Sequence, residues 1–142
     1  MKILFVDDDI YKINTVVDFL NKKLDCTIEI ENAINPGLKS LATKGFDLVL
    51  LDMSMPIFSL TENENYNPFG GIDFLREMKR TKNKTPVIII TQYEIFGEGH
   101  LRKTSEDINN NCIKQFDNYK GLVVYSSTED DWKEDLLKKI GG

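Results

Sequence analysis

Short apolar runs recur along the chain, and the segments between them carry apolar residues at every third or fourth position. Short runs rich in Val, Ile and Leu are typical of strands buried on both faces of a parallel sheet. Five such strands are expected, over residues 3–6, 26–30, 46–51, 86–90 and 121–125. The pattern therefore alternates between strand and helix from the start of the chain.

The segments between the strands predict helices. The first, over residues 10–24, has one apolar face made by Ile10, Ile13, Val17, Leu20 and Leu24. Others are expected over 36–44, from Pro36 to a cap at Gly45, and over 71–82. The last helix has Trp132, Leu136, Leu137 and Ile140 on one stripe. This alternation predicts an α/β fold: a doubly wound five-stranded parallel sheet in the order 2-1-3-4-5, with helices on both faces.

The length of 142 residues predicts a single domain over residues 1–142. Two connections are longer than usual for such a fold. One is an inserted polar loop at about 57–70, and the other is an extended fourth connection at about 92–120. The second is expected to contain a helix with Leu101, Ile108, Ile113 and Phe116 on its inner side.

The net charge of -5 provides no basic field for a nucleic-acid backbone or an anionic membrane surface. No apolar run approaches the roughly 20 residues that span a bilayer. Cys26 and Cys112 are isolated thiols without metal-ligand spacing, and no signal peptide is expected. The sequence thus indicates a cytoplasmic protein, with nucleic acid and membrane excluded as partners.

Acidic residues follow two of the predicted strands. Asp7, Asp8 and Asp9 come after the first strand, Asp52 after the third, and Thr91 ends the fourth. Ligands of parallel α/β sheets bind at the carboxyl ends of the strands, where the strand order reverses. Neighbouring carboxylates repel one another unless a cation lies among them, and an oxygen-only set suits Mg²⁺. The sequence therefore predicts a magnesium site made by Asp7, Asp8 and Asp52.

Other polar and aromatic residues are expected to have structural roles. Asp9 is interpreted as the N-cap of the first helix. Thr91 by itself is an ordinary strand residue, and its place beside the carboxylates is what makes it a candidate. His100, the one histidine, is interpreted as an exposed loop residue, and Trp132 as part of the core.

Three segments together resemble the receiver domain of two-component response regulators: ILFVDDD, DLVLLDMSMP and PVIIITQ. The resemblance extends over nearly the whole chain. It implies that Asp7 and Asp8 hold Mg²⁺ with the main-chain carbonyl of Ser54, and that Asp52 is the phosphoacceptor. It also implies that Thr91 hydrogen-bonds the phosphoryl group. The partners implied are a histidine kinase or phosphotransfer protein and a downstream protein target.

The fifth strand departs from that pattern. The family carries a Lys there, followed by Pro, whereas GLVVYSS places Tyr125 at the Lys, Ser126 at the Pro and Leu122 at an aromatic position. A Tyr offers a neutral hydrogen bond in place of an ammonium group. Three basic residues of the long fourth connection could substitute for the missing Lys but are better interpreted as surface charges: Arg102, Lys103 and Lys120.

The leading hypothesis is a stand-alone receiver that takes a phosphoryl group onto Asp52 and signals by docking to another protein. A second is a pseudo-receiver, an interaction module without regulated phosphorylation, which Tyr125 and Leu122 favour. A third is a haloacid-dehalogenase-like phosphohydrolase with Asp7 as nucleophile, Thr91 as second motif and Asp130 and Asp131 as its last acids. That hypothesis leaves Asp52 without a role.

Overall fold

The computed structural model describes residues 1–57, 66–92, 95–97 and 99–141. Its centre is a parallel sheet of five strands in the order β2-β1-β3-β6-β9. The strands are β1 (Lys2–Val6), β2 (Thr27–Glu31), β3 (Leu48–Leu51), β6 (Val87–Thr91) and β9 (Tyr119–Val124). This is the predicted order 2-1-3-4-5, so the doubly wound, flavodoxin-like topology is confirmed.

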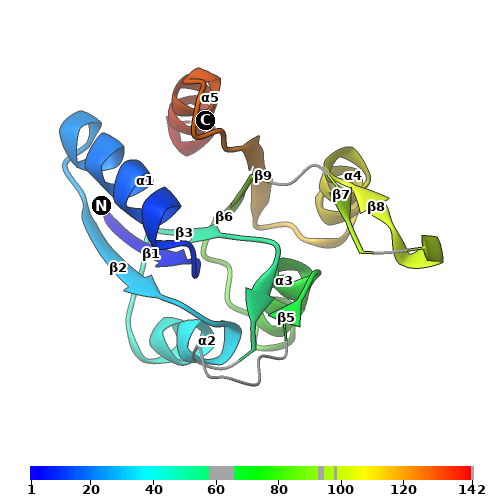
Figure 1. Cartoon of the computed structure of the whole chain (residues 1–142). Coiled ribbons are helices and arrows are strands. Elements are labelled where there is room, and N and C mark those ends of the chain that lie inside the picture. Colours follow the sequence, from blue (N-terminus) through cyan, green and yellow to red (C-terminus); the bar gives the residue numbers. More distant parts are fainter. Residues whose placement is uncertain (58–65, 93–94, 98, 142) are drawn as a thin grey trace.

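The α-helices of the described part of the chain cover the two faces of the sheet (Figure 1). They are α1 (Ile10–Lys23), α2 (Ile34–Thr43), α3 (Gly70–Arg80), α4 (Ser105–Gln115) and α5 (Asp131–Gly141). Successive side chains of a strand point to opposite faces. In β1, Ile3 and Phe5 therefore pack with α1 and α5, whereas Leu4 and Val6 pack with α2, α3 and α4.

The long connections contain small additional elements. The expected inserted loop holds a two-stranded antiparallel pair, β4 (Met55–Pro56) with β5 (Tyr66–Asn67), and residues 58–65 lie outside the described part. The fourth connection holds a second pair, β7 (Ile95–Phe96) with β8 (Lys103–Thr104), and the short helix η1 (Gly99–Leu101). In Figure 1 this pair extends to the right, beside α4.

The start of α4 has a clear local cause. The Thr104 side chain accepts a hydrogen bond from the Asp107 N–H at 3.1 Å, and the Asp107 carboxylate accepts one from the Thr104 N–H at 3.2 Å. Such a reciprocal capping box satisfies two donors that the first turn of a helix leaves unpaired. Ile108 and Phe116 are buried as predicted, but Ile113 is 59% exposed and Cys112 is buried instead. The side chain of Leu101 lies outside the described part.

Several predicted boundaries are wrong by a few residues. Helix α2 begins at Ile34, two residues before Pro36, because Ile34 is buried in the core. It ends at the extended residue Lys44 and is not capped by Gly45. Helix α3 ends at Arg80 and not at 82, because Lys82 has a φ of 60° in the turn that follows.

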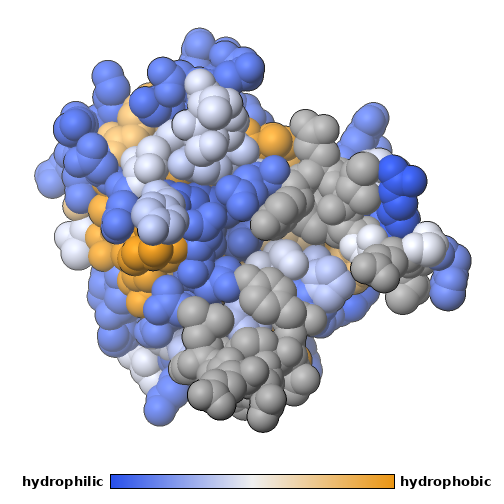
Figure 2. Space-filling view, viewed as in Figure 1, coloured by the Kyte–Doolittle hydropathy of each residue, from blue (hydrophilic) through white to orange (hydrophobic). Residues whose placement is uncertain are grey.

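The side chains of β2 are also more exposed than expected. This strand lies at the edge of the sheet, next to β1 alone, and each of its residues is either exposed or partly buried. Hydrophilic side chains predominate on the face seen in Figure 2, and apolar ones form only small groups there. Among the described residues, no helix combines the length and apolar character needed to cross a bilayer.

The two isoleucines of α4 test the orientation of that helix. Ile108→Ala is expected to lower the free energy of unfolding by about 2–5 kcal/mol, because it leaves a cavity beneath the helix. Ile113→Ala, on the exposed side, should change it by no more than about 0.5 kcal/mol. Urea unfolding followed by circular dichroism measures both. Equal losses of stability in the two variants would contradict the orientation described here.

Candidate acidic metal and phosphoacceptor site

The carboxylates predicted from the sequence lie together at one end of the sheet. Strands β1 and β3 are parallel neighbours with Val6 opposite Leu51, and the Asp52 N–H donates to the Val6 carbonyl at 3.0 Å. Asp7 and Asp52 are therefore adjacent where the two strands end. One carboxylate oxygen from each of Asp7, Asp8 and Asp52 lies within 4.8 Å of the others. An all-oxygen set at this spacing fits the ligand preference of Mg²⁺.

Two of these acids are shielded from water. Asp7 is fully buried and Asp52 is 5% exposed, whereas Asp8 is partly exposed. Burial raises the pKa of Asp52 to about 7, against the opposing effect of the nearby Lys12 charge. Burial raises the pKa of Asp7 for the same reason, again opposed by Lys12. The pocket therefore favours a cation that stabilises the ionised carboxylates.

The structure adds Lys12, which was not among the site residues predicted from the sequence. Its side chain is 1% exposed, and its Nζ lies 2.6 Å from Asp7 Oδ2 and 3.3 Å from Asp52 Oδ1. The same Nζ donates to the Ile90 carbonyl of β6 at 2.6 Å. Burial alone would lower the pKa of Lys12, but the charges of Asp52 and Asp7 outweigh it and raise the pKa. Lys12 is therefore a buried, charged ammonium in the acidic pocket.

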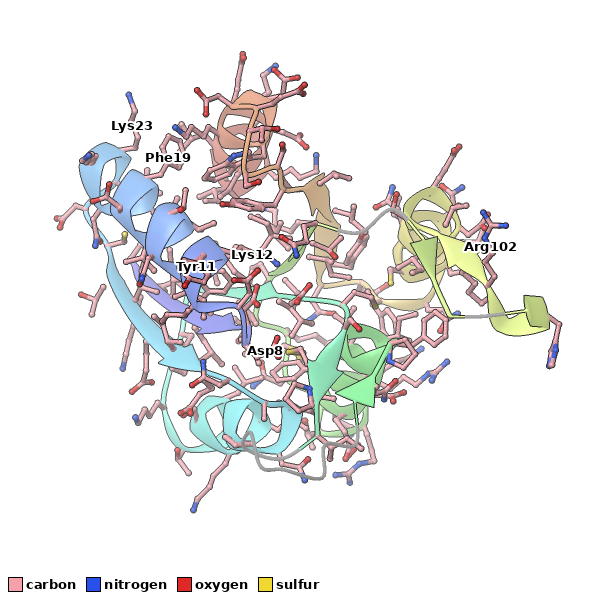
Figure 3. All side chains as sticks on the ribbon, in the orientation of Figure 1. Asp8, Tyr11, Lys12, Phe19, Lys23 and Arg102 are labelled. Carbon is pink, nitrogen blue, oxygen red and sulfur yellow. The ribbon has the colours of Figure 1, made fainter. Side chains whose placement is uncertain are left out.

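The position of Lys12 follows from the start of α1. The Asp9 side chain caps this helix by accepting hydrogen bonds from the N–H groups of Tyr11 and Lys12, so its predicted role is confirmed. Figure 3 labels Lys12 on the first turn of α1 and Asp8 in the loop that precedes the helix. Lys12 lies four residues before Val16 and eight before Leu20, both buried. This spacing of Lys12 from two buried apolar residues is the feature of the sequence that could have indicated its burial.

The position of Ile10 shows that the buried face of α1 differs from the predicted one. It was predicted to point inward, yet its side chain is 57% exposed, because the inner face begins at Lys12 and Ile13. The apolar pattern alone favoured the isoleucine over the lysine.

Two further candidates lie at the same end of the sheet. Thr91 is the last residue of β6 and is fully buried. Ile89 of β6 pairs with Leu51 of β3. Thr91, two residues after Ile89, and Asp52, directly after Leu51, therefore lie at the ends of neighbouring strands. Ser54 is partly exposed and lies between β3 and β4.

Tyr125 follows β9 and belongs to the core. It is 5% exposed, its ring centroid lies 5.1 Å from that of Trp132, and its N–H donates to the Thr91 carbonyl at 2.7 Å. Trp132 itself is 3% exposed, so its predicted core role is confirmed. The aromatic ring at the position of the expected Lys thus fills the space between β9 and α5.

The remaining candidates lie on the surface. Arg102, Lys103, Lys120 and His100 are all exposed. The side chain of Asp130 is 83% exposed and pairs with Lys133 at 3.3 Å. Asp130 and Asp131 are not members of the acidic cluster found among the described residues. The arrangement required of a haloacid-dehalogenase-like site is therefore not the one observed.

Comparison with known proteins identifies the family of this chain. Residues 3–118 match the family model of the response regulator receiver domain. The chain is 33% identical over 150 residues to the Detocs response regulatory protein DtcB of Enterobacter cloacae, covering 99% of this chain and 98% of that protein. It is 28% identical to the uncharacterized protein y4jR of Sinorhizobium fredii, covering 94% and 92%. The chain belongs to the response regulator receiver family.

Solved structures share the fold at lower sequence identity. The Francisella response regulator 1452 receiver domain has a TM-score of 0.66 at 18% identity, covering 99% of this chain and 93% of that one. TrrA of Thermotoga maritima, solved in complex with Mg²⁺ and BeF, has a TM-score of 0.64 at 23% identity, covering 97% of each chain. Receiver domains bind Mg²⁺ in an acidic pocket, and they are signalling domains, not classical enzymes.

The raised pKa of Asp52 gives a testable pH dependence in the metal-free protein. Its folded-state pKa of about 7 exceeds the ordinary value of 3.8, so the folded state holds the proton more tightly than the unfolded chain does. The contribution of Asp52 to stability therefore falls as the pH rises from about 4 to about 7. Asp52→Asn is expected to raise the free energy of unfolding near pH 8, by on the order of 1–3 kcal/mol, but not near pH 4.

Urea unfolding in the presence of a chelator, repeated across this pH range, measures the effect. Asp117→Asn is the matched control, because Asp117 is an exposed acid of a loop. A stability difference between Asp52→Asn and the unmodified protein that stays constant with pH would contradict the assignment.

Proposed function

We propose that this chain is a receiver domain whose Asp52 accepts a phosphoryl group in a Mg²⁺-dependent reaction. The observation that carries the proposal is the meeting of Asp7, Asp8 and Asp52 within 4.8 Å at the strand ends. Membership of the receiver family supports the same reaction class.

In the proposed reaction, a carboxylate oxygen of Asp52 forms a new bond to phosphorus. The bond from phosphorus to the leaving atom, an imidazole nitrogen of a phosphohistidine donor or the carboxyl oxygen of acetyl phosphate, breaks at the same time, and the electron pair departs with the leaving group. Asp7, Asp8, Asp52 and the main-chain carbonyl of Ser54 would hold Mg²⁺, which when bound offsets the negative charge of the carboxylates and of the transferred group. The Thr91 hydroxyl, at the end of β6, hydrogen-bonds a phosphoryl oxygen.

Members of this family interact with histidine kinases and with downstream targets. The phosphoryl donor proposed for this chain is a histidine kinase or a phosphotransfer protein in the cytoplasm. Its output is docking to a downstream protein through the surface built from the fourth connection, β9 and α5. Within the family, that surface is where this chain departs most from the usual sequence.

The pseudo-receiver remains a second candidate, favoured by Tyr125 and Leu122 at two positions of the switch pattern. Beryllofluoride, a phosphoryl mimic, separates the two functions. A phosphorylated receiver should bind it in the presence of Mg²⁺, with nuclear magnetic resonance shifts that extend from Asp52 to Tyr125. An interaction module should show no such binding.

Incubation with Mg²⁺ and acetyl phosphate tests the phosphoacceptor directly. Intact-protein mass spectrometry is expected to show one added phosphoryl group, which is lost in Asp52→Ala because the attacking carboxylate is gone. Removal of the metal by a chelator should also abolish the addition. Asp117→Ala, which removes an exposed acid, serves as the control and should be modified like the unmodified protein.

Equal modification of Asp52→Ala and the unmodified protein would refute Asp52 as acceptor. Hydrolysis of a generic phosphate ester that is lost in Asp7→Asn and kept in Asp52→Asn would favour the phosphohydrolase instead.

A further inference from the structure

The acidic pocket has a cation of its own. Three carboxylates lie within 4.8 Å of one another, and among the described residues Lys12 alone forms an ion pair with Asp7 or Asp52. An ammonium group that is 1% exposed gives up nearly all contact with water, so it must be stabilised by the groups around it. Those groups are two carboxylates that belong to the proposed phosphoacceptor site.

We propose that Lys12, on α1, contacts the phosphoryl group on Asp52 and takes the place of the lysine that receivers carry on the fifth strand. The inference rests on the function proposed above and adds a catalytic residue to it. It places the cation on a different element of the fold, while the number of positive side-chain charges in the pocket stays the same.

The fifth-strand position is occupied by a buried aromatic side chain. Tyr125 is buried against Trp132 on the face of the sheet covered by α1 and α5. Its backbone N–H is bonded to the Thr91 carbonyl, which fixes the strand end beside the site. Tyr125 therefore contributes packing at this position, and the charge comes from the neighbouring helix.

Lys12 has two short contacts and one long contact, and the long contact is with the proposed phosphoacceptor Asp52. Nζ lies 2.6 Å from Asp7 Oδ2 and donates to the Ile90 carbonyl at 2.6 Å. Asp52 Oδ1 lies farther from Nζ, at 3.3 Å, and accepts a hydrogen bond from the Met53 N–H at 2.8 Å. The Asp7 and Ile90 contacts hold the ammonium in place, and the long contact is the one that a phosphoryl oxygen replaces.

In the reaction, the new O–P bond to Asp52 forms while the bond from phosphorus to the leaving group breaks. The leaving group departs with the electron pair of the broken bond. Lys12 keeps its proton throughout. It donates from Nζ to a phosphoryl oxygen on which negative charge collects. The residue therefore acts by electrostatic stabilisation and not by acid or base catalysis.

Lys12→Met tests the inference, because Met keeps an unbranched chain and removes the charge. With Mg²⁺ and acetyl phosphate, the rate constant of Asp52 phosphorylation is expected to fall by about 100- to 1,000-fold, the scale of losing one donor to a developing charge. Lys12→Arg, which retains the charge, should recover part of the rate. Lys23→Met makes the same change on the last turn of α1, where Lys23 is exposed (Figure 3), and should match the unmodified protein.

The outcomes separate this inference from the proposed function. If the unmodified protein takes no phosphoryl group on Asp52, the proposed function and this inference both fail. If it is phosphorylated and Lys12→Met is phosphorylated at the same rate, the inference alone is overturned. Circular dichroism establishes that the variant is folded before its rate is compared.

A measurement on the unmodified protein covers the case of an unfolded variant. Nitrogen-15 labelling of lysine side chains gives an Nζ resonance for the buried Lys12, which exchanges its protons slowly. Addition of Mg²⁺ and beryllofluoride is expected to shift this resonance, because Nζ gains a fluoride neighbour in place of Asp52 Oδ1. A Lys12 Nζ resonance that stays unchanged while beryllofluoride binds at Asp52 would overturn the proposed contact.

Discussion

The ion pair between Lys12 and the two buried aspartates is the interaction on which the acidic pocket depends. Asp7 and Asp52 lie out of water at adjacent strand ends, where their like charges would repel at close range. The ammonium lies 2.6 Å from one and 3.3 Å from the other. The ammonium lowers the free-energy cost of keeping both carboxylates ionised. Asp8, the third acid, is partly exposed to solvent. The site thus combines a buried positive charge with one partly exposed acid.

The rest of the fold supplies the geometry for this pair. Strands β1, β3 and β6 are parallel neighbours, so the residues after them gather at one edge of the sheet. Gly71 holds the other side of the Asp52 segment: a Cβ at this position would lie 2.9 Å from the Asp52 carbonyl oxygen, too close for any larger residue without movement. Its N–H donates to the Met53 carbonyl at 2.8 Å. The start of α3 is therefore packed directly against the backbone that carries the candidate phosphoacceptor.

Placing the cation on α1 has a consequence for how this receiver relates to its family. Lys12 is bonded to the Ile90 carbonyl, so the charge is tied to β6 and to the helix after β1. The strand end at Tyr125 instead joins the aromatic packing with Trp132 of α5. The positive charge beside the acids thus comes from α1, whereas the residue after β9 contributes to the packing of α5. The acids follow the family pattern, and the departure lies in where their counter-charge comes from.

The sheet order, the two acidic strand ends and the cap at Asp9 could be predicted from the sequence, because strand alternation, topology rules and local hydrogen bonding leave recognisable sequence patterns. The same patterns placed Ile10 inward and Ile113 in the core and did not indicate Lys12, since apolar periodicity ranks a lysine as a surface residue. The burial of Lys12 follows only from tertiary contacts, because its partners Asp7, Asp52 and Ile90 lie within or directly after three different strands. A buried charge is stabilised by groups that are distant in the chain, and the local sequence pattern does not indicate which groups these are.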